Sequence, residues 1–189
     1  MADENNSTVV EHHPLQPFLP EGAWLLMLGS FPPSQQRWSM DFFYPNFIND
    51  MWRIFGLLFF NDKDHFVDTE NKRFRKEQLV EFLTRKGVAL YDTASAVRRT
   101  TGTASDKDLE IVTPTDPHCT TVVTTGEKAT TVFASHFSCA MPKVGESAEF
   151  LFEGRKIKLF RMPSSSRAYP MKLEKKAEQY RKVLIGEQQ

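Results

Sequence analysis

The sequence predicts a three-layer α/β/α sandwich with a central, mostly parallel sheet of about four strands. Short and uniformly apolar runs occupy 23–28, 88–91 and 120–125, which is typical of parallel strands that are buried on both faces. Amphipathic segments with helical periodicity separate these runs, and strands that alternate with helices form a sheet covered on both sides. The 189 residues are enough for one domain with a buried core.

The domain is expected to be continuous. Residues 1–13 are polar and acidic, so they are interpreted as a flexible N-terminal tail before a single domain at 14–189. Asn46 is expected to cap the first helix, Gly87 to stop the second, and Pro170 to lie in the first turn of the last. In chain order the expected elements are a strand at 23–28, helices at 46–60 and 73–86, strands at 88–91 and 120–125, a helix at 127–136, strands at 150–152 and 157–160 that form a hairpin or a bend, and a helix at 170–185.

Composition excludes several classes of protein. No apolar run reaches the roughly 18 residues of a membrane helix, and the N-terminus has no apolar core of a secretory signal. Cys119 and Cys139 are too few for a disulfide framework or for a structural zinc or iron–sulfur site, so we expect a cytoplasmic protein without a metal or other cofactor. We also expect a monomer.

The net charge is zero, but basic residues gather near the C-terminus. Between Gly154 and Ile185 ten Lys and Arg residues face only Glu174 and Glu178, a local balance of +8. Such a stretch can contact phosphates, or it can be the solvated face of the closing helix. Charge alone leaves both interpretations open, with the solvated face favoured.

Four loops follow the carboxyl ends of the predicted strands, where ligands of such sheets bind. They begin at Gly29, Asp92, Thr125 and Met162. The first combines a glycine with two prolines, which gives close backbone approach in a rigid loop. The last contains Ser164, Ser165 and Ser166, whose hydroxyl and N–H groups are suited to hold a phosphate. Either loop alone is a weak signal.

The segment 41–52 is rich in aromatic residues and contains amides near a helix start. It could stack a flat base and bind its edge. Core aromatic residues with a capping amide are the alternative, and without the other loops that alternative is favoured.

Six motifs in order resemble the uracil-DNA glycosylase superfamily, in particular its hypoxanthine-DNA glycosylase branch. Each motif is weak by itself, but their order over residues 13–169 is fairly specific. The six matches are Leu28–Pro32, Tyr44 with Asn49–Trp52, Gly87–Asp92, Val112–Asp116, Gly126–Ala129 and Met162–Ser166.

The resemblance implies a monofunctional DNA glycosylase of base excision repair. Such an enzyme flips a deaminated base such as hypoxanthine or uracil out of DNA and cuts its N-glycosidic bond by hydrolysis. Its partner is DNA that contains a damaged base. The implied catalytic residue is Asn49; the implied base-binding residues are Gly29, Ser30, Phe31, Tyr44 and Asp92; the implied DNA-binding residues are Pro163, Ser164, Ser165, Ser166, Arg167 and Tyr169.

Three departures from the family pattern bear on function. Phe31 stands where many members carry a catalytic Asp or Asn, Pro33 replaces a thymine-excluding tyrosine, and Arg167 replaces a usual proline. An inactive DNA-binding relative and a hydrolase of small nucleotides therefore stay open as alternatives. Asp92 could also act as a base or merely as a cap, the latter being favoured, and Asp50 is expected to complement the positive N-terminus of its helix.

Overall fold

A computed structural model describes residues 10–98, 107–108 and 118–186. Its centre is a sheet of five strands, and all its neighbouring strands run parallel except the last pair. In spatial order the strands are β5 (Val88–Asp92), β2 (Leu25–Gly29), β8 (Thr121–Thr125), β10 (Arg155–Met162) and β9 (Ser147–Phe152). The fold class is thus confirmed, with one strand more than the expected four or so.

The fifth strand is β9, which forms with β10 the hairpin that the sequence leaves open as an alternative to a bend. Glu153 and Gly154, which connect these two strands, both have positive φ, a conformation that allows a tight reversal. β9 therefore lies antiparallel at the edge, whereas β2 lies between two parallel partners and is buried along its whole length. This matches the uniformly apolar run at 23–28.

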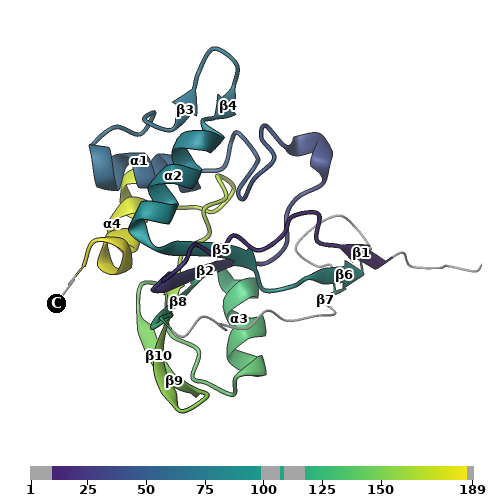
Figure 1. The fold of residues 1–189 in the computed structure, drawn as a ribbon, viewed down its shortest axis with the longest axis vertical. Helices are drawn as coiled ribbons and strands as arrows, with labels where there is room; N and C mark the ends of the chain where they lie inside the picture. The colour runs from purple at the N-terminus through teal and green to yellow at the C-terminus, as the bar shows by residue number, and fades with distance from the viewer. Residues whose placement is uncertain (1–9, 99–106, 109–117, 187–189) are drawn as a thin grey trace, which may run out of the picture.

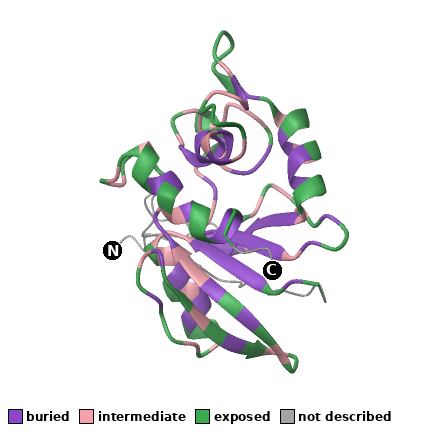
Figure 2. Ribbon diagram, turned by 90° about the vertical axis from the view of Figure 1, so that its left-hand side faces the viewer, coloured by how far each residue is buried: buried purple, intermediate pink, exposed green. Residues whose placement is uncertain are grey.

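Helices cover both faces of the sheet (Figure 1). α1 (Met51–Phe60), α2 (Lys76–Lys86) and α4 (Leu173–Leu184) lie on one side, and α3 (Glu127–His136) lies on the other. α1 and α4 pack directly against each other. Figure 2 shows the buried core along the central strands and on the inner sides of the helices. α3 has the bounds that the sequence predicts.

The other helices begin later than predicted. α1 begins at Met51 rather than Asn46, because the Asp50 N–H donates to the Ser165 carbonyl instead of starting a helical turn at 46. α2 begins at Lys76 because Arg73 pairs in a short hairpin, β3 (Val67–Asp68) with β4 (Arg73–Phe74). α4 begins at Leu173, three residues after the proline expected in its first turn.

The segment before β2 runs along the sheet. β1 (Val10–His12) pairs antiparallel with β6 (Ala96–Arg98), which also pairs with β7 (Lys107–Asp108). Phe18 then exchanges two backbone hydrogen bonds with Leu90 of β5. Residues 1–13 are predicted to form a tail, whereas 10–13 are hydrogen-bonded to the domain. No helix among the described residues is long and apolar enough to span a membrane.

Candidate active site

A cavity of about 470 Å³ opens at the edge of the sheet where β2, β5 and β8 end. The loops after these strands, the aromatic segment and the serine-rich loop at 163–169 contribute its walls. Pro163 and Tyr169 are absent from the lining, and the Val112–Asp116 motif lies outside the described residues. The predicted site residues that line the cavity are Gly29, Ser30, Phe31, Tyr44, Asn49, Asp92, Ser164, Ser165, Ser166 and Arg167.

Asp92 ends β5 beside Gly29, which ends β2 in register with it. A Cβ at position 29 would collide with Oδ1 of Asp92, so the glycine leaves room for this carboxylate. The other carboxylate oxygen, Oδ2, lies 2.7 Å from Nε2 of His13. The His13 side chain is 1% exposed and that of Asp92 10%, so this polar pair is almost wholly enclosed. The sequence favours a cap for Asp92; the structure instead shows a buried His–carboxylate pair at the cavity wall.

His13 belongs to the site through Asp92, although it lies in the segment that is predicted to be a tail. Its ring packs at 4.5 Å between centroids on Tyr91 and edge-on at 5.3 Å against Phe31. Phe31 thus supports His13 at the position where many members of the resembled superfamily carry a catalytic Asp or Asn. No local pattern could reveal this contact, because His13 and Asp92 are 79 positions apart.

Tyr44 lies in the left-handed backbone region, with φ of 50°. Its ring lies edge-on to Trp52 at 5.7 Å, and its hydroxyl lies 3.3 Å from Oγ1 of Thr125. Burial, and then the charge of Asp92, raise the pKa of the Tyr44 phenol above its usual value. Tyr44 therefore stays a neutral hydroxyl at the cavity wall.

Asn49 lines the cavity, and the two ends of its amide differ in their hydrogen bonds. Its Oδ1 accepts the Met51 N–H at 2.9 Å and so caps the first turn of α1. Among the described residues the amide Nδ2 donates no hydrogen bond, which leaves a donor for a ligand. The backbone carbonyl of Asn49 accepts a bond from Arg53, whose guanidinium also binds the Phe47 carbonyl. Arg53 is 8% exposed, its burial lowers its pKa, and it fixes the turn that carries Asn49.

The serine-rich loop is held by its own hydroxyls. Oγ of Ser164 accepts the Ser166 N–H, and Oγ of Ser166 accepts the Ala168 N–H. Each hydroxyl still has its own proton to donate. Ser165 is buried and its carbonyl accepts the Asp50 N–H, while Pro163 is tied through its carbonyl to the Tyr180 hydroxyl at 2.7 Å.

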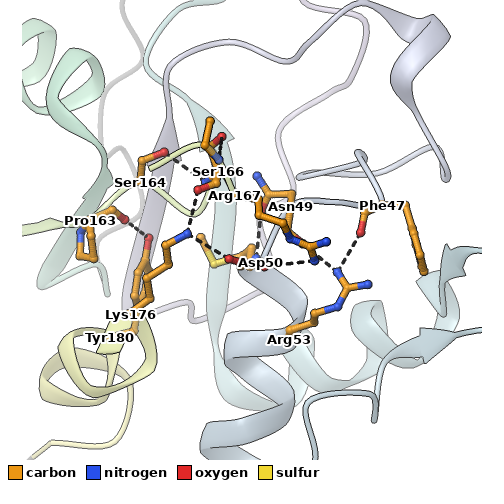
Figure 3. A network of polar contacts seen from close by, with 12 residues as sticks. Phe47, Asn49, Asp50, Arg53, Pro163, Ser164, Ser166, Arg167, Lys176 and Tyr180 are labelled. Atoms are coloured by element: carbon orange, nitrogen blue, oxygen red, sulfur yellow. Dashed lines mark hydrogen bonds and ion pairs between the residues drawn. The ribbon is translucent and has the colours of Figure 1, made fainter. Parts of the chain in front are cut away.

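A buried lysine joins this loop to α1 (Figure 3). Nζ of Lys176 donates to Oδ2 of Asp50 at 3.0 Å and to the Ser166 carbonyl at 2.7 Å. Arg167 approaches Oδ1 of the same carboxylate at 3.4 Å. Lys176 is fully buried, so the basic stretch is not a uniformly solvated helix face, and Asp50 pairs with two cations besides lying at the helix start.

Within the described residues, no group of three or more His, Cys, Asp or Glu could hold a metal ion. The cavity carries charge of both signs, because Arg37, Lys128 and Arg167 line it together with Asp92. An arrangement of this kind can receive a flat polar ring at Tyr44 and Asp92 and an anionic group at the cationic side chains and the serines.

No family model matches the sequence, and no curated protein matches it. Among solved structures, the chain is similar to the solution NMR structure of a protein from Methanosarcina acetivorans named a "putative Uracil DNA glycosylase". The TM-score is 0.59 at 18% sequence identity, and the alignment covers 93% of this chain and 97% of that chain. At such an identity the likeness concerns the fold. This chain therefore shares the mixed α/β fold of that protein over nearly its whole length.

Proposed function

We propose that this protein is a monomeric, monofunctional DNA glycosylase that flips out a deaminated base such as hypoxanthine or uracil and excises it by hydrolysis. The observation that carries the proposal is the cavity itself. Ten residues implied by the family resemblance, drawn from separate loops, line one cavity at the carboxyl edge of the sheet. The likeness in fold to the Methanosarcina acetivorans protein named a "putative Uracil DNA glycosylase" supports the same activity.

The flipped base would lie against Tyr44 and Asp92. The neutral phenol ring offers a face for stacking, and the Asp92 carboxylate offers an acceptor to the edge of the base. The Gly29–Phe31 loop would approach the base carbonyl with its backbone, where negative charge accumulates as the base leaves.

In the reaction a water oxygen bonds to C1′ of the sugar while the C1′–N bond breaks. The bonding electrons leave with the base, which then takes up a proton, and the water loses one. An amide does not titrate, so Asn49 acts through Nδ2, which donates to the leaving base or holds the attacking water. Catalysis is then mainly electrostatic and positional. We do not propose that Lys128 forms a Schiff base with the sugar, so the enzyme is expected to leave the DNA strand uncut at the abasic site.

DNA would lie over the serine-rich loop. The Ser164 and Ser166 hydroxyls can donate to phosphate oxygens, and Arg167, with a side chain 53% exposed, can add charge. Arg167 or Tyr169 would fill the gap that the flipped nucleotide leaves in the base stack.

Single-turnover excision tests the proposal on oligonucleotides that each contain one lesion, with alkali to reveal abasic sites. The decisive pair of variants is Asn49→Asp and Asn49→Ala. Asp keeps the acceptor for the Met51 N–H but removes the donor, so it should fold well and still lose excision by about 10²-fold. Ala loses both groups and should also cost about 1 kcal/mol of stability.

Three outcomes would count against the proposal. Wild-type rates in both Asn49 variants, after correction for folded fraction by thermal melting, would remove Asn49 from the reaction. Lesion binding without excision by the wild type would favour an inactive DNA-binding relative. Hydrolysis of free nucleotides only would favour a small-molecule hydrolase.

A further inference from the structure

The hydrogen bonds of His13 fix its protonation state. Nδ1 of its ring accepts the backbone N–H of Leu15 at 3.1 Å, so this nitrogen carries no proton. Nε2 must then carry the ring proton, which it donates to Oδ2 of Asp92 at 2.7 Å. His13 is thus a neutral donor with one defined tautomer.

His13 is also held in place. Its backbone N–H donates to the Ser95 carbonyl at 2.8 Å, and its ring is packed against Phe31, Phe43 and Tyr91. The donor therefore approaches Asp92 from a single direction. Among the described residues the bond from His13 is the one hydrogen bond that this carboxylate accepts, and Asp92 lines the cavity.

We propose that His13 is a positioning residue that makes Asp92 present a fixed hydrogen-bond acceptor to the cavity, and that this acceptor selects a base with a ring N–H beside a carbonyl. The inference rests on the proposed function and adds a chemical basis for its substrate class. Deamination converts the ring nitrogen acceptor of adenine or cytosine into such an N–H. A carboxylate can only accept, so it binds this N–H and opposes the lone pair of the parent base. Guanine and thymine carry the same N–H, so this acceptor distinguishes a deaminated base from its parent base and not from guanine or thymine.

Asp92→Asn should reverse the hydrogen-bonding character of this wall of the cavity. His13 offers a proton, so it would retain the amide oxygen of the new side chain and turn its NH₂ toward the cavity. The cavity would then present a donor where the wild type presents an acceptor. Excision of the preferred deaminated base should fall by about 10²-fold or more.

Removal of His13 should then have opposite effects in the two backgrounds. With Asp92 present, His13→Leu leaves the carboxylate without its donor and should reduce excision about tenfold. In the Asp92→Asn background, His13→Leu frees the new amide to rotate its oxygen into the cavity and should raise excision about tenfold. His12→Leu is the matched control, since His12 is exposed in β1, and it should change neither rate.

Single-turnover rates for hypoxanthine, uracil, adenine and cytosine in one oligonucleotide context measure these effects, with melting curves to report the folded fraction. Loss of excision on His13→Leu in both backgrounds would overturn the proposal, because it would make His13 merely structural. If His13→Leu does not fold, His13→Gln offers both a donor and an acceptor, so it should retain excision with Asp92 and should not lower it further with Asp92→Asn. Equal loss in both backgrounds would again overturn the proposal.

A second measurement does not depend on activity. The ¹⁵N chemical shifts of the His13 ring near pH 7 report its tautomer, and they should show a protonated Nε2 and an unprotonated Nδ1. A doubly protonated ring, or a proton on Nδ1, would overturn the inference even if the enzyme excises bases. A wild type that excises nothing but has the expected tautomer would instead refute the proposed function, and with it the selection of a base.

Discussion

Replacement of Lys176 by Met should destabilise the protein strongly. Among the residues that the structure describes, the change would leave the Asp50 carboxylate, 5% exposed, with only the Arg167 contact at 3.4 Å, and that arginine is half in solvent. The Ser166 carbonyl would also lose its 2.7 Å donor. Removal of one partner of a buried ion pair costs about 3–5 kcal/mol. At about 2–4 °C per kcal/mol for a chain of this size, the melting temperature should fall by about 6–20 °C.

Thermal melting and urea unfolding measure the effect, with Lys175→Met as the matched control. Lys175 is the exposed neighbour on the same helix and its ion pair is with the exposed Glu178, so its loss should cost less than about 1 kcal/mol. Adding Asp50→Asn to Lys176→Met should recover part of the stability, because it removes the buried charge that Lys176 had compensated. Equal melting temperatures for Lys176→Met and Lys175→Met would refute the role of the ion pair in stability.

Three further predictions concern DNA, pH and the cavity wall. Arg167→Gln should reduce the slope of the logarithm of DNA affinity against the logarithm of salt concentration by about 1. Lys156 lies at the start of β10, at the end away from the serine-rich loop, so Lys156→Gln should leave this slope unchanged. Equal slopes for the two variants would exclude a phosphate contact at Arg167. Burial raises the pKa of Tyr180 well above 10.0, so this phenol stabilises the fold below pH 10 and loses that contribution as pH rises further. Tyr180→Phe removes the hydroxyl that donates to the Pro163 carbonyl and should cost about 1 kcal/mol at pH 7. Urea unfolding at several pH values should show this deficit shrinking by up to about 1.4 kcal/mol per pH unit above pH 10, and a constant deficit would contradict the raised pKa. Gly29→Ala should displace the Asp92 carboxylate, lower stability by about 1–3 kcal/mol and impair excision, and a crystal structure with Asp92 unmoved would argue against the steric role.

The sequence predicts the sheet well because each parallel strand is a local signal. β2 and β5 are buried along their whole lengths, so their apolar runs stand out without knowledge of their partners. α3 is likewise delimited by Gly126 and its own periodicity. The loops that line the cavity could be predicted for the same reason, since each follows a recognisable strand.

The supporting contacts could not be predicted in this way. In the sequence Lys176 is one more cation on an amphipathic helix, and only the fold brings it to Asp50, 126 positions earlier. His13 likewise precedes Asp92 by 79 positions, in a segment too polar to suggest a strand. The predicted start of α1 is wrong because a tertiary bond from Asp50 to Ser165 replaces the first helical turn. Long-range polar pairs leave no periodic trace in a sequence.

The pairing of Lys176 with Asp50 also has a consequence for how the protein matures. A ribosome releases α1 long before α4, and domains begin to fold from the segments that emerge first. Until α4 emerges, nascent chains would hold a carboxylate at the start of α1 with no buried cation to meet it. The serine-rich loop would lack both the Lys176 bond to Ser166 and the Tyr180 bond to Pro163. A nascent chain that already has its parallel sheet should therefore keep a poorly anchored serine-rich loop until residues 176–180 have left the ribosome.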